Sequence, residues 1–197
     1  MHTQTHIIMG AALGGRSSRN AWAGAAGGLL PDIPMLLAVA GLKIMAVPDP
    51  IIFGIIYWQE WLQVANAVGH DFFLWGGLAV LALWRRERLA ATAGDIDRWS
   101  MALVLALSGF LHTLVDFFCH REDAHMSFWP LSRWKFMSPV SYWDPAHYGH
   151  IISTAEALLG LVLAMLLFQR FPNHWTRILL AFAMLLYAAV PAYFILR

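Results

Sequence analysis

Residues 99–120 read WSMALVLALSGFLHTLVDFFCH, and this stretch decides the fold class. The segment Trp99–Cys119 contains a single charged residue, Asp116, in a run that is otherwise largely apolar. About 20 such residues are enough for a helix to cross the hydrocarbon core of a bilayer. We therefore predict that this stretch is a transmembrane helix and that the chain is an integral membrane protein.

The composition of the whole chain agrees with this prediction. Hydrophobic residues make up 59% of the 197 residues and charged residues 13%, whereas soluble domains have about half and about a quarter. The mean hydropathy is +0.58. The net charge is +1 and no run of basic residues exceeds Arg85-Arg86, so the sequence indicates no nucleic-acid partner. Cys119 is the only cysteine, which excludes an intrachain disulfide and a cysteine-based zinc cluster.

Four further segments have the length and composition of membrane-crossing helices. They are Ala21–Val47, Trp61–Trp84, Ile151–Phe168 and Trp175–Leu196. Ahead of them, His2–Leu13 is apolar but too short to cross, and we expect it to form a half-inserted helix. The sequence thus predicts an all-α, polytopic transmembrane bundle of about five spans plus this short helix. Residues 1–197 would form a single integral-membrane domain.

Basic residues between the predicted spans indicate an orientation. If successive spans alternate in direction, eight Lys or Arg residues fall on one side of the membrane and five on the other. The side with the larger number is usually cytoplasmic. The eight are Arg16, Arg19, Arg85, Arg86, Arg88, Arg98, Arg170 and Arg177, and the five are Lys43, Arg121, Arg133, Lys135 and Arg197.

The opposite side carries a long loop, residues 120–150, between the third and fourth spans. The loop is rich in Trp and Tyr, which favour the membrane interface. These residues are Trp129, Trp134, Tyr142, Trp143 and Tyr148. We therefore predict a non-cytoplasmic loop that folds back and covers the helix ends.

Ionisable residues inside the predicted spans gather toward the same side as this loop. His70 lies early in the second span and Glu156 early in the fourth, and both spans begin on that side. His112 and Asp116 lie late in the third span, which ends there, and Asp32 lies near mid-depth in the first. Each ionisable residue in a span costs a few kcal/mol, so by default such residues indicate a functional site.

The spacing of these residues favours a metal site. His112, Asp116 and His120 recur every four residues and therefore share one face of a helix. Two ligands one helical turn apart can bind the same ion. His2 and His6 have the same spacing, and they reach the site if the half-inserted helix enters from the loop side.

We predict that the metal ligands are His6, Asp32, His70, His112 and Asp116. Imidazole and carboxylate groups suit a divalent ion, with zinc expected first and iron or manganese as alternatives. A structural interpretation stays open for each residue. An intramembrane histidine often hydrogen-bonds a neighbouring helix, and Asp32, between two prolines, can satisfy backbone amides freed by the helix break.

Short motifs along residues 1–135 also point to a family. They are Thr5-His6 followed by Gly10, Leu29-Leu30-Pro31-Asp32, His112-x-x-x-Asp116 and Trp129-Pro130. Their order and spacing resemble a family of small integral-membrane, metal-dependent hydrolases, also described as LexA-regulated, inner-membrane-associated hydrolases. His70-Asp71 stands where members often have His-Ser, so this match is weaker.

The resemblance implies a multi-pass protein of the bacterial inner membrane with a candidate His/Asp site. Residues 138–147 resemble a narrower bacterial branch that sometimes carries a cobalamin-biosynthesis label. Nothing in these residues indicates corrin chemistry.

The leading hypothesis is a membrane-embedded, metal-dependent hydrolase that acts on a lipid or lipid-linked phosphoester or ester. A bound divalent ion would lower the pKa of a water molecule so that it attacks at neutral pH. Glu156 and His120 are the predicted catalytic residues, because either can carry the proton. Arg121, Arg133 or Lys135 would hold an anionic head group of the membrane lipid.

The alternative is a non-catalytic subunit or assembly factor of a larger membrane complex. Ten Trp and twelve Phe residues provide apolar surface for a protein partner within the membrane. The polar cluster would then be metal-free and closed by its own hydrogen bonds. A transporter with a broken first span is a third possibility, but the sequence has no detectable repeat to favour it.

Overall fold

The computed structural model of the chain describes residues 1–88 and 91–195, and the side-chain surroundings as far as residue 189. Within these ranges the regular structure is helical, with no strand. The α-helices are α1 (Thr3–Leu13), α2 (Ser18–Leu29), α3 (Ile33–Ile44), α4 (Asp49–Ile51), α5 (Glu60–Gly69), α6 (Phe72–Arg88), α7 (Ala93–Cys119), α8 (Gly149–Arg170) and α9 (His174–Ile195). Short helical turns are η1 (Leu30–Asp32), η2 (Ile52–Ile56) and η3 (Pro145–His147). The prediction of an all-α protein is confirmed.

Four stretches are long and apolar enough to cross a membrane. They are Ser18–Ile44 (α2, η1 and α3), Glu60–Arg88 (α5 and α6), Ala93–Cys119 (α7) and Gly149–Arg170 (α8). The predicted last span, Trp175–Leu196, corresponds to α9, and the part of α9 whose side-chain surroundings are described, His174–Ala189, is apolar. Leu196 and Arg197 lie outside the described residues. The chain is therefore a helical membrane protein.

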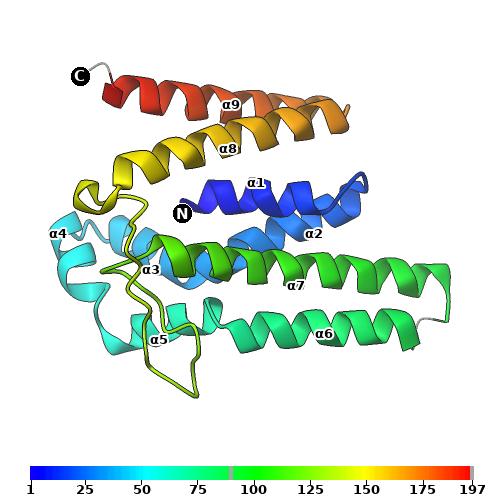
Figure 1. Cartoon of the computed structure of the whole chain (residues 1–197), viewed down its shortest axis with the longest axis horizontal. Coiled ribbons are helices and arrows are strands. Elements are labelled where there is room, and N and C mark those ends of the chain that lie inside the picture. Colours follow the sequence, from blue (N-terminus) through cyan, green and yellow to red (C-terminus); the bar gives the residue numbers. More distant parts are fainter. Residues whose placement is uncertain (89–90, 196–197) are drawn as a thin grey trace.

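The long helices lie side by side, with α1 inside the bundle (Figure 1). α1 contacts α2, α7 and α8, while α6 packs on α7 and α9 packs on α8. The start of α1 lies at the same end of the bundle as the end of α7 and the start of α8. The short N-terminal helix therefore enters from the end where the long loop runs, which brings its first residues to the polar residues of α7.

Glycines let α1, α2 and α7 approach until their backbones touch. A Cβ atom on Gly10 would lie 2.0 Å from the carbonyl oxygen of Gly24, and one on Gly27 would lie 2.1 Å from that of Leu105. Ser108 Oγ donates a hydrogen bond of 2.7 Å to the Gly24 carbonyl oxygen, which links α7 to α2. Small residues at such contacts are a common means of packing helices in membranes, where lipid weakens the hydrophobic drive for association.

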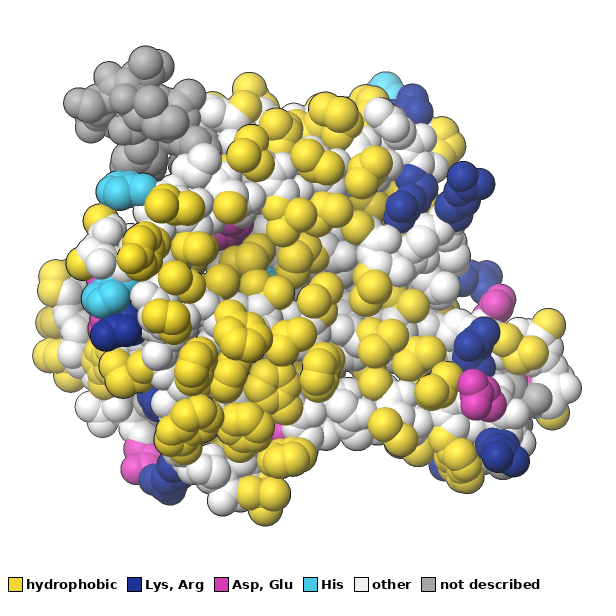
Figure 2. Space-filling model, in the orientation of Figure 1, with side chains coloured by type: hydrophobic (Ala, Val, Ile, Leu, Met, Phe, Trp, Pro, Cys, Tyr) yellow, Lys and Arg dark blue, Asp and Glu magenta, His cyan; other side chains and the backbone are white. Residues whose placement is uncertain are grey.

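Much of the outer surface of the helices is apolar. Leu37, Val80 and Leu179 are 67%, 69% and 62% exposed. Figure 2 shows hydrophobic side chains spread over one face of the bundle, with most Lys and Arg side chains in this view gathered at one end. At that end the chain turns from α1 to α2, from α6 to α7 and from α8 to α9 (Figure 1). An apolar surface with basic residues at the helix ends is expected of a membrane-spanning bundle.

The connection between α7 and α8, residues 120–148, runs at the opposite end and packs on several helix ends. The Ser127 carbonyl oxygen accepts a hydrogen bond of 3.0 Å from the Phe72 amide at the start of α6. Lys135 Nζ lies 2.7 Å from Gln63 Oε1 on α5, and the Tyr142 amide donates to the Cys119 carbonyl oxygen at 3.0 Å. The loop therefore lies over the ends of α5, α6 and α7. That this end of the bundle is the non-cytoplasmic one stays a prediction.

Candidate metal centre

Asp32 is positioned by a break in the first membrane-crossing stretch. Pro31 and Pro34 flank it, and the chain passes here from α2 through η1 to α3. A proline lacks the backbone N–H and its ring crowds the preceding turn, so a regular α-helix is interrupted. Thr3 Oγ1, from the start of α1, donates a hydrogen bond of 2.5 Å to Asp32 Oδ2. The carboxylate is thus fixed from the α1 side.

His70 lies at a second break, between α5 and α6. Asp71 Oδ1 accepts hydrogen bonds of 2.5 and 2.9 Å from the amides of Phe73 and Leu74, and so caps the first turn of α6. The cap lets the chain turn just after His70 and restart as a helix. The imidazole is thereby held at the end of α5 instead of on the side of a continuous helix.

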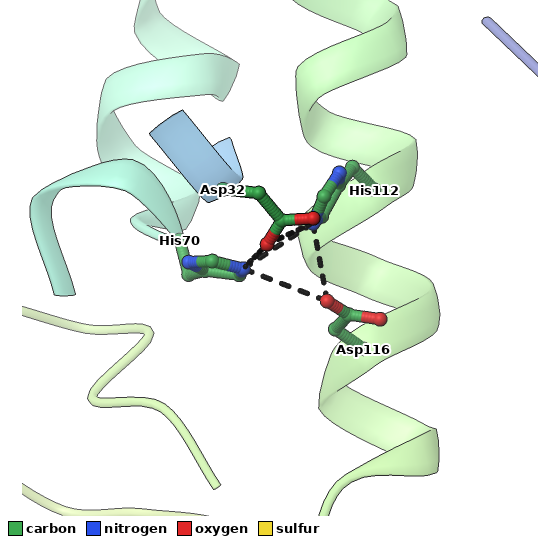
Figure 3. A group of neighbouring side chains, drawn as sticks. All are labelled: Asp32, His70, His112 and Asp116. Atoms are coloured by element: carbon green, nitrogen blue, oxygen red, sulfur yellow. Dashed lines mark hydrogen bonds and ion pairs between the residues drawn. The ribbon is translucent and has the colours of Figure 1, made fainter. Parts of the chain in front are cut away.

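His112 and Asp116 lie one turn apart on α7, as their spacing predicts. With Asp32 and His70 they form a group of four in which no residue is more than 6% exposed. Figure 3 shows the four side chains converging from η1, from the α5–α6 break and from α7. The structure therefore brings together four of the five predicted metal ligands.

The distances within the group fit a tetrahedral ion. His112 Nε2 lies 3.2 Å from His70 Nε2 and 3.1 Å from Asp116 Oδ2. Asp32 Oδ1 lies 3.5 Å from His70 Nε2 and 3.6 Å from His112 Nε2. An ion with bonds of about 2.0–2.1 Å has ligand–ligand edges of about 3.3–3.4 Å. These distances lie close to that range and all four ligand atoms lie within 4.8 Å of one another, so the four residues can close on one ion by small side-chain movements.

The two histidines direct their acceptor nitrogens at the same point. His70 Nδ1 lies 3.0 Å from the carbonyl oxygen of Asn66, and His112 Nδ1 lies 2.8 Å from that of Gly28. A carbonyl oxygen only accepts, so each Nδ1 carries a proton and each neutral ring presents a lone pair on Nε2. Two such lone pairs, facing each other beside two carboxylates, require a shared cation, either a proton or a metal ion. Metal-binding histidines are commonly oriented by this kind of Nδ1 hydrogen bond.

His6, the fifth predicted ligand, lies beside this group of four instead of within it. Its Nε2 is 2.8 Å from Asp116 Oδ1, the carboxylate oxygen that faces away from His112. The His6 ring is buried and stacks on His112 with centroids 3.6 Å apart. His6 therefore orients Asp116 and supports one face of the His112 ring.

His120, a predicted catalytic residue, also contacts the outer oxygen of Asp116. Its Nε2 lies 3.5 Å from Asp116 Oδ1, and its Nδ1 lies 2.9 Å from Asp123 Oδ2. Burial alone lowers the pKa of His120, but the charge of Asp116 and the close contacts with Asp116 and Asp123 more than offset this, so the pKa is raised. His125, from the loop, forms a second possible metal-binding group with Asp116 and His120.

Glu156, the other predicted catalytic residue, lies apart from both groups. It accepts hydrogen bonds of 2.8 Å from the His2 amide and 2.7 Å from Thr5 Oγ1. Its carboxylate therefore anchors the start of α1 to α8. His2 Nδ1 lies 3.1 Å from each oxygen of Glu156. Because the His2 side chain lines a cavity at the metal centre, His2 connects Glu156 to that cavity.

The basic residues proposed for an anionic head group are occupied elsewhere. Arg133 Nη1 lies 2.7 Å from Glu60 Oε1, and Arg121 Nη1 donates to the Ser138 carbonyl oxygen at 3.1 Å. Lys135 pairs with Gln63, and burial lowers the pKa of its ammonium. Among the described residues, none of these three lines the cavity at the metal centre.

A cavity of about 470 Å³ opens beside the centre. Asp32, His70 and Asp116 line one part of it. Its aromatic part is formed by Phe53, Tyr57, Trp58, Tyr142 and Trp143. Burial raises the pKa of Tyr57 and of Tyr142, so both hydroxyls stay protonated and can donate hydrogen bonds. The cavity is thus lined on one part by residues of the metal centre and on another by aromatic side chains, two of which carry hydroxyl groups.

The structure places at this cavity two residues that the sequence did not single out. Both polar atoms of the Asn66 side chain are buried and have no hydrogen-bond partner among the described residues. His125 was one of several loop histidines with no spacing pattern to distinguish it. Asn66 lies in an apolar span, four residues before His70, and that spacing was the only available signal.

Comparisons with protein-family models, with curated proteins and with solved structures find no match to this chain. The family resemblance therefore depends on the short motifs alone.

Proposed function

We propose that the protein is a membrane-embedded, metal-dependent hydrolase of the bacterial inner membrane. Its substrate would be a lipid or lipid-linked phosphoester or ester. One observation carries the proposal: two imidazole lone pairs and two carboxylates converge at tetrahedral spacing inside a membrane protein. Buried ionisable groups at membrane depth are costly, and a bound cation would offset that cost. The motif resemblance supports the same class of protein.

The cavity favours a catalytic centre over a structural one. Structural zinc sites are closed by protein ligands, whereas catalytic sites keep a position open to water or substrate. Asp32, His70 and Asp116 line a cavity of about 470 Å³, so an ion bound by the four residues would be open on that side and would take water or substrate as a fifth ligand. Zinc is the first choice, with iron or manganese as alternatives, because all three accept imidazole and carboxylate ligands.

The chain's own groups then have defined tasks around the ion. A divalent ion in such a site polarises the substrate and lowers the pKa of bound water. Asn66 offers a free amide donor and acceptor at the cavity wall, which can orient an ester. His120, beside the carboxylate of Asp123, can accept a proton, and Glu156 can do so through His2.

The wall of the cavity supports a membrane lipid as the substrate. Phe53, Trp58 and Trp143 offer apolar surface for a chain or ring, and Tyr57 and Tyr142 add hydroxyl groups. Tyr and Trp combine an apolar body with a polar tip and are favoured at the bilayer interface. A lipid can therefore place its head at the polar group and its apolar part against the aromatic wall.

Metal analysis tests this proposal most directly. The protein would be purified in detergent and its bound metal measured by mass spectrometry, beside a His112→Ala, Asp116→Ala double variant. We expect near-stoichiometric zinc, iron or manganese in the wild type and none in the double variant. His174→Ala serves as a matched control, because this histidine is exposed at the start of α9. It should retain the metal.

A lipid panel tests the hydrolase activity. Fluorogenic phosphoester and acyl-ester lipids in mixed micelles should be hydrolysed by the wild type, with a loss of at least about 100-fold in the double variant, since even indirect contacts to a metal typically change activity 10–100-fold. No metal after reconstitution would contradict the proposal. The cluster would then be a structural hydrogen-bond network, and co-purification with other membrane proteins would favour the non-catalytic subunit.

A further inference from the structure

A second group of metal-binding residues shares Asp116 with the first. Asp116, His120 and His125 each offer one ligand atom, and these atoms lie within 4.8 Å of one another. Asp116 and His120 are buried, and His125 is partly exposed toward the cavity that it lines. Because Asp116 belongs to both groups, a single carboxylate joins them.

The two oxygens of Asp116 face different sides. Oδ2 lies 3.1 Å from His112 Nε2 and 3.5 Å from His70 Nε2, on the side of the first centre. Oδ1 lies 3.5 Å from His120 Nε2 and 2.8 Å from His6 Nε2, on the other side. The carboxylate therefore has the geometry of a bridge, with one oxygen available to each side.

The second side is built to attract positive charge. The α-amino group of Met1 lies 2.5 Å from Asp116 Oδ1 and 3.4 Å from His120 Nε2. Asp123 Oδ2 lies 2.9 Å from His120 Nδ1 as an ion pair without hydrogen-bond geometry, and His120 Nε2 faces Asp116 Oδ1 at 3.5 Å. The His125 ring stacks on His70 with centroids 3.7 Å apart, so the two sides are adjacent.

We propose that a second divalent ion is bound by Asp116 Oδ1, His120 and His125, and that Asp116 bridges it to the ion of the first centre. The inference rests on the first centre of the proposed function. Two ions bridged in this way lie about 3.5–4 Å apart, as in many sites that hydrolyse phosphoesters.

The charge of the cavity gives the second ion a task. Apart from the Met1 amino group, no basic Lys or Arg side chain is among the described residues that line the cavity, which include Asp32, Asp116 and Asp123. With neutral histidines, one divalent ion leaves the three carboxylates and the Met1 ammonium with no net charge, and two ions leave a net positive charge. An incoming phosphate therefore gains no net attraction in the first case and is attracted in the second. The second ion therefore narrows the substrate class to a phosphoester.

This assignment changes the role of His120. Its Nε2 binds an ion and is no longer free to accept a proton. Proton transfer then falls to His2 and Glu156, because His2 lines the cavity and its Nδ1 lies 3.1 Å from each Glu156 oxygen.

Manganese binding to the chelator-stripped protein tests the inference. The protein would be tagged at its C-terminus, because the Met1 amino group lies at the site. Metal equivalents would be counted after Mn²⁺ titration, and electron paramagnetic resonance would distinguish a coupled pair from an isolated ion. We expect two equivalents and a coupled signal in the wild type.

His125→Phe keeps a ring that can stack on His70 but removes the ligand nitrogens. We expect one equivalent with an isolated six-line signal, while His150→Phe, an exposed histidine at the start of α8, should keep two equivalents. The ratio of phosphoester to acyl-ester hydrolysis should fall about tenfold or more in His125→Phe, since the cavity loses the net positive charge of the second ion. An unchanged ratio would overturn the phosphoester assignment.

The wild-type spectrum keeps the inference testable even if His125→Phe fails to fold. One equivalent with only an isolated signal would overturn the second centre and leave the proposed function intact. No bound metal at all would overturn both. Two coupled ions retained in a folded His125→Phe protein would overturn the assignment of His125.

Discussion

The helices around the candidate centre and the helix pair α8–α9 pack in different ways. Between α1 and α2 the closest approach joins backbone atoms, since a Cβ on Gly24 would lie 1.9 Å from the Gly10 carbonyl oxygen. Between α8 and α9 the corresponding approach is made by a side chain, since a Cβ on Gly160 would lie 2.3 Å from Tyr187 Cζ. A tyrosine ring can move alone, whereas a helix backbone moves only with the whole helix.

The difference matters because the helices in backbone contact are those that orient the candidate ligands. The Gly28 carbonyl oxygen on α2 fixes the tautomer of His112 on α7, and Thr3 on α1 fixes Asp32. Any change in the spacing of α1, α2 and α7 therefore shifts ligand atoms. α8 supplies no member of the four-residue group, so the site tolerates adjustments there. Glycine-to-alanine changes at three positions test this comparison with the same added methyl group.

Gly24→Ala should have the largest effect. The new Cβ would overlap the Gly10 carbonyl, and α1 must move away from α2 to relieve the overlap. Overpacking of this kind costs about 1–3 kcal/mol or more. We expect a lower unfolding temperature in detergent together with reduced metal binding. An unchanged unfolding temperature would show that the α1–α2 backbone contact is not rigid.

Gly160→Ala should have a smaller effect, confined to stability. Its Cβ would displace the Tyr187 ring, whose hydroxyl lies 2.7 Å from Thr5 Oγ1. Loss of that hydrogen bond costs about 1 kcal/mol. Thermal unfolding should show a modest decrease, while the number of bound metal ions stays that of the wild type. A loss of metal as large as that of Gly24→Ala would refute the contrast between the two regions.

Gly77→Ala should have the smallest effect and the opposite sign. A Cβ at this exposed position of α6 meets no atom within 4 Å. Alanine favours the helix over glycine by up to about 1 kcal/mol, so stability should rise slightly. Unfolding temperature and metal content measured beside the other two variants complete the series. A destabilised Gly77→Ala protein would mean that added bulk on any helix is harmful.

The candidate site was only partly predictable from the sequence. The four-residue spacing of His112 and Asp116 on an apolar helix indicated a shared face, and the structure has that face. Asp32 and His70 were grouped with them because all four residues were predicted to lie toward the same side of the membrane. The structure places the ligand atoms of the four side chains within 4.8 Å of one another. Glu156 is on that side too, but it binds the start of α1, because α1 lies between α8 and α7.

The sequence by itself determined that the chain is a bundle of membrane helices with ionisable residues near one end. These properties follow from local hydropathy and from the helical period, which act over one or a few turns. Only the tertiary structure decided which oxygen of Asp116 faces His112, that Asn66 has no hydrogen-bond partner in the described part of the chain, and that His125 joins His120. These contacts depend on backbone spacing set by glycines and on the path of a long loop, and neither has a local periodic signature.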